Sequence, residues 1–96
     1  MGKPVIRLGA DQTTGHSGYF PVVPVGASGN VFVNGLGVVR NGDPYQPHWK
    51  PKKPPHTGYA TSGATVFVNG KPAQRAGDGN TCGDTASNGS GNVGFG

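Results

Sequence analysis

Four side chains in this sequence are good ligands for a soft or borderline metal ion: His16, His48, His56 and Cys82. One thiolate with three imidazoles suits tetrahedral Zn²⁺, and four protein ligands close its coordination shell. We therefore expect one structural zinc per chain, with iron as the second choice. The ligands lack the dense spacing of zinc fingers, so the open alternative is three surface histidines and one small buried thiol.

The composition also calls for a stabilising element other than a large apolar core. Hydrophobic residues make up 32% of the 96 residues, while 19 glycines and 9 prolines give a content usually seen in disordered segments. A single cysteine excludes an internal disulfide, so a metal is the remaining cross-link for a small domain. We expect a single domain over residues 1–96.

The sequence contains few residues that could act as a general base. The carboxylates are Asp11, Asp43, Asp78 and Asp84, and there is no glutamate to serve as a general base. A zinc ion with four protein ligands keeps no open position for water, unlike a catalytic zinc. We expect no catalytic residues and no enzyme activity.

A nucleic-acid-binding module is the other class of zinc protein to weigh. Net charge is +4, but only 12% of residues are charged, and no recognition helix or stacking platform is visible. Basic residues gather only at Lys50, Lys52 and Lys53, beside Trp49. This segment is either a contact for lipid headgroups or nucleic acid, or a solvated loop; we expect no nucleic-acid partner.

An internal repeat predicts the elements that position these residues. Residues 31–35 (VFVNG) recur as residues 66–70, and Asn-Gly between apolar runs is the strongest signal for a type I′ hairpin. Each turn leads into a similar arm, GVVR at 37–40 and PAQR at 72–75. The sequence therefore predicts two hairpins, and the absence of 3.6-residue periodicity predicts essentially no helix.

A third copy of the repeat is divided between the two ends of the chain. Residues 4–7 (PVIR) match the arms, and residues 91–96 (GNVGFG) match the strand before the turn. We expect these ends to pair antiparallel and complete a pseudo-threefold β domain. The alternative is a chance likeness of Gly-rich ends.

The metal ligands fall in the loops between the repeats. His16 begins a stretch (HSGY) that matches HTGY at His56, and Cys82 lies in the corresponding third loop. Threefold packing brings these three to one axis, with His48 added from the longest loop. Each arm also ends in an arginine followed by an aspartate, which either pair with each other or contact a partner protein.

The three arms resemble the Pro-Ala-Ala-Arg motif of the PAAR-repeat family, although only residues 72–75 keep Pro-Ala and residues 37–40 lack the proline. The resemblance covers the arms, the VFVNG strands and the His/His/His/Cys set. It implies an all-β, pseudo-threefold cone of hairpins, stapled by a metal near its vertex. Its triangular base is expected to sit on the blunt end of a trimeric β-helical spike.

The function implied by the resemblance is structural: the chain caps and sharpens a membrane-piercing spike of a contractile injection machine. The pattern is most similar to a stand-alone tip protein of a T-even-type phage baseplate, which places it in the virion; the alternative is a secreted type VI secretion spike. We expect a monomer in isolation, one tip per spike trimer and transient contact with the target membrane. We expect no toxin extension, which many secretion-system members of the family carry.

Overall fold

The computed structural model describes residues 2–15, 20–47 and 56–95. Its strands are six two-residue segments that form three separate antiparallel pairs, and no helix occurs in the described residues. The pairs are β2 (Phe32–Val33) with β3 (Leu36–Gly37), β4 (Phe67–Val68) with β5 (Lys71–Pro72), and β1 (Lys3–Pro4) with β6 (Gly94–Phe95). The predicted all-β class is confirmed.

The two Asn-Gly hairpins have the predicted turn geometry. Asn34 and Gly35 have φ values of 54° and 79°, and Asn69 and Gly70 have 55° and 78°. Positive φ at both central positions defines a type I′ turn, whose twist matches that of the flanking strands. The sequence therefore fixes these hairpins locally, before any contact between the repeats.

The third hairpin is assembled from the two chain ends, as the split repeat predicted. Lys3 pairs with Phe95 and Pro4 with Gly94, and the Val5 amide donates to the Val93 carbonyl at 3.1 Å. The backbones approach so closely that a Cβ at Gly94 would lie 3.0 Å from the Gly2 carbonyl oxygen. This contact explains why glycine stands where the other two hairpins carry phenylalanine.

The three arms close into a ring around one axis. The Ile6 amide donates to the Gln74 carbonyl (3.1 Å), the Gln74 amide to the Val39 carbonyl (2.9 Å), and the Val39 amide to the Ile6 carbonyl (3.1 Å). All three residues are fully buried. Each arm thus satisfies its backbone groups with the other two, which gives a single chain pseudo-threefold symmetry.

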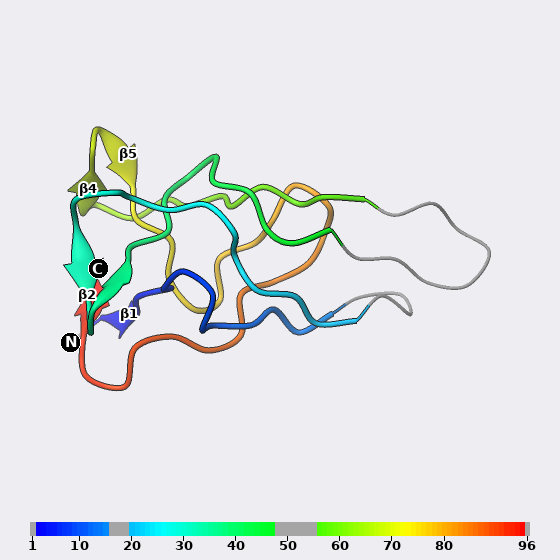
Figure 1. Cartoon of the computed structure of the whole chain (residues 1–96), viewed down its shortest axis with the longest axis horizontal. Coiled ribbons are helices and arrows are strands. Elements are labelled where there is room, and N and C mark those ends of the chain that lie inside the picture. Colours follow the sequence, from blue (N-terminus) through cyan, green and yellow to red (C-terminus); the bar gives the residue numbers. More distant parts are fainter. Residues whose placement is uncertain (1, 16–19, 48–55, 96) are drawn as a thin grey trace.

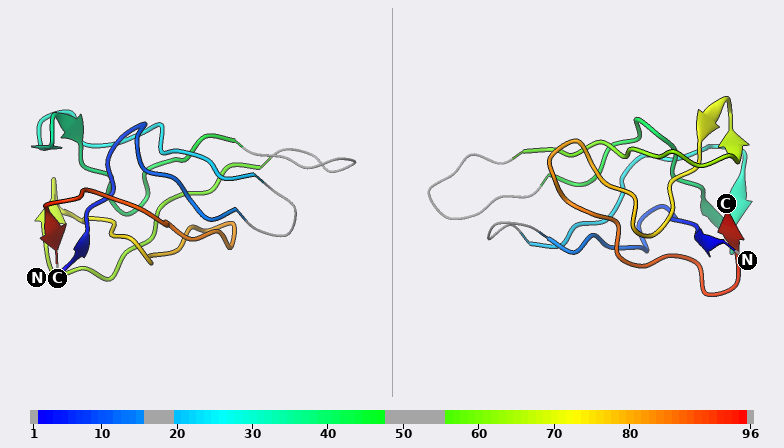
Figure 2. Two further views of the ribbon diagram at one scale, coloured as in Figure 1. Left: turned by 90° about the horizontal axis from the view of Figure 1, so that it is seen from below. Right: turned by 180° about the vertical axis from the view of Figure 1, so that it is seen from behind.

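A second set of contacts between the units consists of antiparallel β-bridges, which follow the arms in sequence. Each bridge joins one unit to its neighbour: Thr13 with Ala86, Tyr45 with Pro24, and Asn80 with Ala60. Figure 2 shows the resulting intertwined path, in which segments far apart in sequence run side by side. Long-range backbone pairing therefore takes the place of long strands.

The apolar core is divided into two layers along the axis. One layer lies under the hairpins and contains Val5, Val33, Val38, Val68 and Ala73, with Val93 and Phe95 packed against it. The other layer consists of Ile6, Val22, Val39, Tyr45, Ala60 and Ala86. Both layers are small, in keeping with the low apolar content of the sequence.

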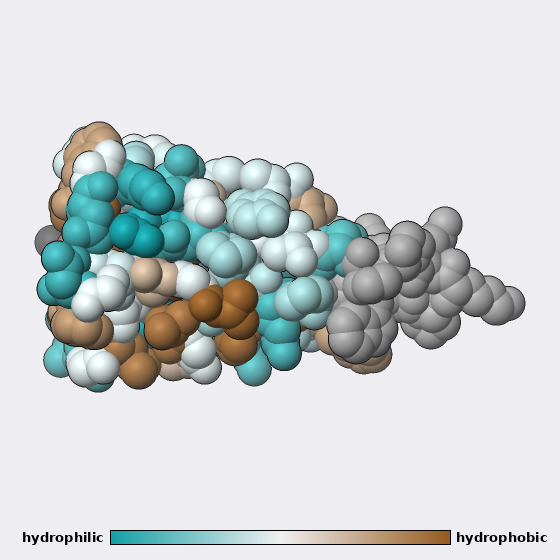
Figure 3. Space-filling view, turned by 45° about the horizontal axis from the view of Figure 1, so that its top comes forward, coloured by the Kyte–Doolittle hydropathy of each residue, from teal (hydrophilic) through white to brown (hydrophobic). Residues whose placement is uncertain are grey.

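The two ends of the molecule are built differently. The three hairpins gather at one end together with both ends of the described chain, and the described chain is interrupted after residue 15 and after residue 47 at the other (Figure 1). We call these the hairpin end and the loop end. The described body is broad at the hairpin end and narrower away from it (Figure 3). Its residues include no helix long and apolar enough to span a membrane.

Candidate metal centre and docking face

The loop end carries three loops that start and finish at matching hydrogen bonds. In each, an amide donates to the carbonyl that closes the loop: Thr13 to Val22 (2.9 Å), Tyr45 to Gly58 (2.9 Å) and Asn80 to Asp84 (2.8 Å). The lengths differ, because these bonds enclose residues 14–21, 46–57 and 81–83. The repeat thus supplies equivalent anchors but unequal loops.

Counting back from these closing bonds shows which described residues are equivalent. His56 lies two residues before Gly58, and Cys82 lies two residues before Asp84, so the two occupy equivalent positions. In the first unit that position belongs to Phe20. The match of HSGY to HTGY stays a prediction, because His16 lies outside the described residues.

Two of the four predicted metal ligands are described by the structure. His56 and Cys82 are both partly buried, whereas His16 and His48 lie outside the described residues, as does the segment with Lys50, Lys52 and Lys53. Within the described ranges no group of three His, Cys, Asp or Glu side chains is placed to hold a metal. The four-ligand set stays a prediction.

Cys82 is held in a tight, fully described turn. The Gly83 amide donates to the Asn80 carbonyl at 3.1 Å, and Gly83 has a φ of 94°. A three-residue loop with glycine in the left-handed region is a standard hairpin connection. The local sequence therefore places the thiol on a rigid element.

Gly58 leaves the space that the sulfur of Cys82 occupies. A Cβ at this position would lie 2.7 Å from the sulfur, closer than real Cβ contacts allow. We call this space beside Gly58 the cradle of the thiol. Gly58 lies two residues after His56, so the cradle brings the thiol close to the backbone that carries a second soft ligand. This geometry and the chemistry of the donors agree with a metal site at the loop end.

A chain of buried polar side chains runs towards this site and was not predicted. Tyr45 donates through its hydroxyl to Gln74 Oε1 at 2.5 Å, and Gln74 Nε2 donates to Asn80 Oδ1 at 3.1 Å. Burial, and then the charges of nearby aspartates, raise the pKa of Tyr45, so its hydroxyl keeps the proton that it donates. The one signal in the sequence was the polar Gln74, in an arm whose counterparts carry Ile6 and Val39.

The arginine of each arm clamps the aspartate that follows it. Each pair makes bonds from Nε and Nη2 to the carboxylate, and the arginine amide donates to the same carboxylate at 2.8 Å in all three: Arg7 with Asp11, Arg40 with Asp43 and Arg75 with Asp78. Burial raises the pKa of Asp78, but the bonds and charge of Arg75 outweigh it and hold that pKa below its usual value. Of the two alternatives, intramolecular pairing is the one observed.

Two of these arginines also tie a hairpin to the ring. Arg7 Nη1 donates to Asn34 Oδ1 at 3.2 Å, and Arg40 Nη1 donates to Asn69 Oδ1 at 3.0 Å. The turn asparagines thus serve twice, since they adopt positive φ and accept a bond from another unit. The hairpin end is therefore fixed to the arms by side chains as well as by backbone.

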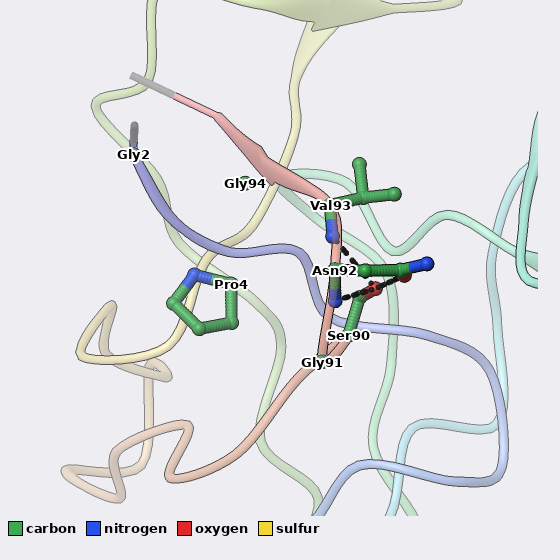
Figure 4. Close-up of a pocket in the computed structure, with 7 residues that line it drawn as sticks. All are labelled: Gly2, Pro4, Ser90, Gly91, Asn92, Val93 and Gly94. Atoms are coloured by element: carbon green, nitrogen blue, oxygen red, sulfur yellow. Dashed lines mark hydrogen bonds between the residues drawn. The ribbon is translucent and has the colours of Figure 1, made fainter.

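The hairpin end presents exposed apolar side chains on two of its three sides. Phe32 and Phe67 occupy equivalent positions and are 58% and 61% exposed, whereas Gly94 takes this place in the third hairpin. Around Gly94 lies a shallow pocket, which Pro4 lines from β1 and Val93 from the segment leading into β6 (Figure 4). The face is threefold in backbone and incomplete in side chains.

The fold and the arms agree with a comparison against protein families. The model of the PAAR motif matches residues 10–87, which is most of the chain. This chain therefore belongs to the PAAR-motif family, whose members cap the spikes of contractile injection systems. A search of curated proteins found no match.

Proposed function

We propose that this chain is the structural tip of a trimeric β-helical spike on a phage tail baseplate, with one tip for each spike trimer. The observation that carries the proposal is the closed ring of Ile6, Val39 and Gln74, which gives one chain a near-threefold face. A trimer ends in a true threefold face, so symmetry favours one tip on three spike chains. The free protein is a monomer in this proposal, because one chain completes the ring.

The hairpin end is the proposed docking face. Exposed Phe32 and Phe67 offer apolar surface there, and the turn asparagines are held rigidly by Arg7 and Arg40. Apolar anchors in a rigid polar setting are typical of stable protein interfaces. The narrower loop end then points away from the spike, towards the target membrane that it touches transiently.

The proposed metal is one structural Zn²⁺, held by His16, His48, His56 and Cys82, with iron as the second choice. Support comes from the thiol over the Gly58 cradle and from His56 two residues before that glycine. When bound, the metal would join the loops of the three units by a cross-link beyond the backbone bridges between them. The loop end is then stiff enough to transmit the force of a contracting tail without splaying.

No reaction is assigned to this protein. Three of its four aspartates are clamped by arginine, and Asp84 is buried, with Oδ1 accepting from the Thr85 amide at 2.8 Å. Carboxylates in these roles are poor general bases, and a closed zinc shell leaves no site for water. A zinc-dependent nucleic-acid module is the least favoured alternative, because no recognition element is found in the described residues.

The virion is the proposed location, and the alternative is the outside of a cell that fires a type VI secretion spike. In both cases the hairpin end would dock on a spike, so the two locations differ in which spike protein is bound. Mixing the purified chain with candidate spikes from both machines and measuring complex mass by light scattering tests location and function together. We expect one tip on three spike chains, with the phage spike.

A matched pair of variants identifies the docking face. The double variant Phe32→Ser, Phe67→Ser should lose spike binding, while Phe20→Ser, which changes a phenylalanine 67% exposed away from the hairpins, should keep it. A complex of three tips on three spike chains, or no binding at micromolar concentration, contradicts the proposal. Metal-dependent hydrolysis by the purified chain contradicts it as well.

A further inference from the structure

Within the described residues, one buried donor at the loop end has no partner, and the buried polar side chains next to it fix its orientation. Gln74 Nε2 donates to the Gly79 carbonyl at 3.0 Å, and a carbonyl can only accept, so the nitrogen of this amide is on that side. Gln74 Oε1 then accepts from Tyr45, as its position requires.

The same logic orients Asn80. Its side chain receives a bond from Gln74 Nε2 at 3.1 Å, so the atom facing Gln74 is the acceptor Oδ1. The Nδ2 group of Asn80 must therefore point the other way. The residue is 8% exposed, and Nδ2 has no hydrogen-bond partner in the part of the chain that the structure describes.

A buried amide without a partner is costly and needs an explanation. Leaving such a donor unsatisfied costs the desolvation energy of the group, with no hydrogen bond to offset it. The rest of the polar chain is paired from Tyr45 to Asn80 Oδ1, so Nδ2 is the one end at which this chain remains open. A partner for Nδ2 must therefore lie in the space that this group faces.

The open end faces the cradle that holds the thiol. The Cβ position of Gly58 lies 3.4 Å from Asn80 Nδ2 and 2.7 Å from Cys82 Sγ, so both atoms border the same small space. The bridge between Ala60 and Asn80 keeps the two loops in this register. Only glycine at position 58 leaves this space free.

We propose that Asn80 is a positioning residue of the metal centre, whose Nδ2 donates an N–H···S hydrogen bond to the metal-bound thiolate of Cys82. A thiolate sulfur carries lone pairs beyond the one that binds the metal, and an amide donor stabilises them. Partners of this kind orient the ligand, and their loss typically lowers metal affinity about 10- to 100-fold. Tyr45 and Gln74 act through Asn80, since they fix which way its amide turns. This inference rests on the metal site of the proposed function.

Cobalt provides the test, because Co²⁺ bound to a thiolate gives a near-ultraviolet charge-transfer band that Zn²⁺ lacks. Asn80→Asp keeps the acceptor for Gln74 and removes the donor. Asn41→Asp is the matched control, since it makes the same change of charge and keeps the acceptor for the Ser62 amide (3.2 Å). We expect Asn80→Asp to bind Zn²⁺ about 10-fold more weakly or worse in chelator competition. Its cobalt band should move to lower energy, because the sulfur lone pairs lose a donor.

Each outcome decides between the two proposals. If the unaltered protein gives no thiolate band with Co²⁺, the metal centre fails and the role of Asn80 fails with it. If that band appears but Asn80→Asp and Asn41→Asp match the unaltered protein in band and affinity, only the role of Asn80 is overturned. Should Asn80→Asp not fold, Asn80→Thr takes its place, since the first unit carries Thr13 at the equivalent position.

Discussion

The hairpin end and the loop end use the same repeat to opposite effect. At the hairpin end the three units are nearly interchangeable, with Val5, Val38 and Ala73 in one apolar layer and a β-pair over each. At the loop end the loops differ in length, and the buried layer contains a polar chain from Tyr45 to Asn80. The comparison teaches that the units of a repeat can stay alike where they pack against one another and diverge at the other end. A single metal site there needs ligands of different kinds from different units.

The largest effect is expected from breaking the loop end. Removing the metal with a strong chelator, or by Cys82→Ala, should lower the melting temperature sharply. Binding to structural zinc sites is worth on the order of 10 kcal/mol gross, which is comparable to the whole stability of a small domain. Thermal unfolding followed by circular dichroism measures the change. The chelator should add nothing in Cys82→Ala, and a metal-free chain that melts unchanged would falsify the staple.

Opening the hairpin end is expected to have the next largest effect. Deleting residues 92–96 removes β6 and the packing of the partly buried Val93 and Phe95 on the core. It should cost up to about 3 to 6 kcal/mol, which is the value for two fully buried side chains. Urea denaturation measures this loss. Phe32→Ser is the control for lost apolar surface, because its side chain is exposed and its strand stays paired. Normal stability in the truncated chain would show that the third hairpin is dispensable.

The smallest effect is expected from breaking one arginine–aspartate pair. The folded pKa of Asp78 lies below its ordinary 3.8, so its pairing with Arg75 stabilises the fold above that pH and is lost as pH falls through the folded pKa. Arg75→Gln should therefore cost about 1 kcal/mol at neutral pH, and the difference from the unaltered protein should shrink below pH 3.8. Denaturation at both pH values measures it. A difference that is constant with pH would mean that the arginine acts by packing.

All three hairpins were predicted from the sequence, but the hydrogen bonds between the repeat units were not. Asn34-Gly35 and Asn69-Gly70 determine their own turns, and the split repeat was enough to pair β1 with β6. The ring of backbone bonds could not be foreseen, because its register depends on three arms meeting at once.

The candidate site was harder to predict, because it depends on which loop positions are equivalent in space. Counting from the backbone bonds makes Phe20, His56 and Cys82 equivalent, and no repeat in the sequence pointed to Phe20. Gln74 resembled a departure from the motif, and only its burial reveals that it joins Tyr45 to Asn80. The roles of His16 and His48 stay predictions, since both lie outside the described residues.

The hairpin made from the two chain ends has one more consequence. Lys3 pairs with Phe95 in the way that Leu36 pairs with Val33, so the break in the chain occupies the site of an Asn-Gly turn. The domain is thus a cycle cut at one of three comparable places. We expect that linking the ends through Asn-Gly and opening the chain between Asn34 and Gly35 gives a circular permutant that keeps the strand pairs of all three hairpins. The architecture would then depend on the cyclic order of the three units and not on which unit comes first.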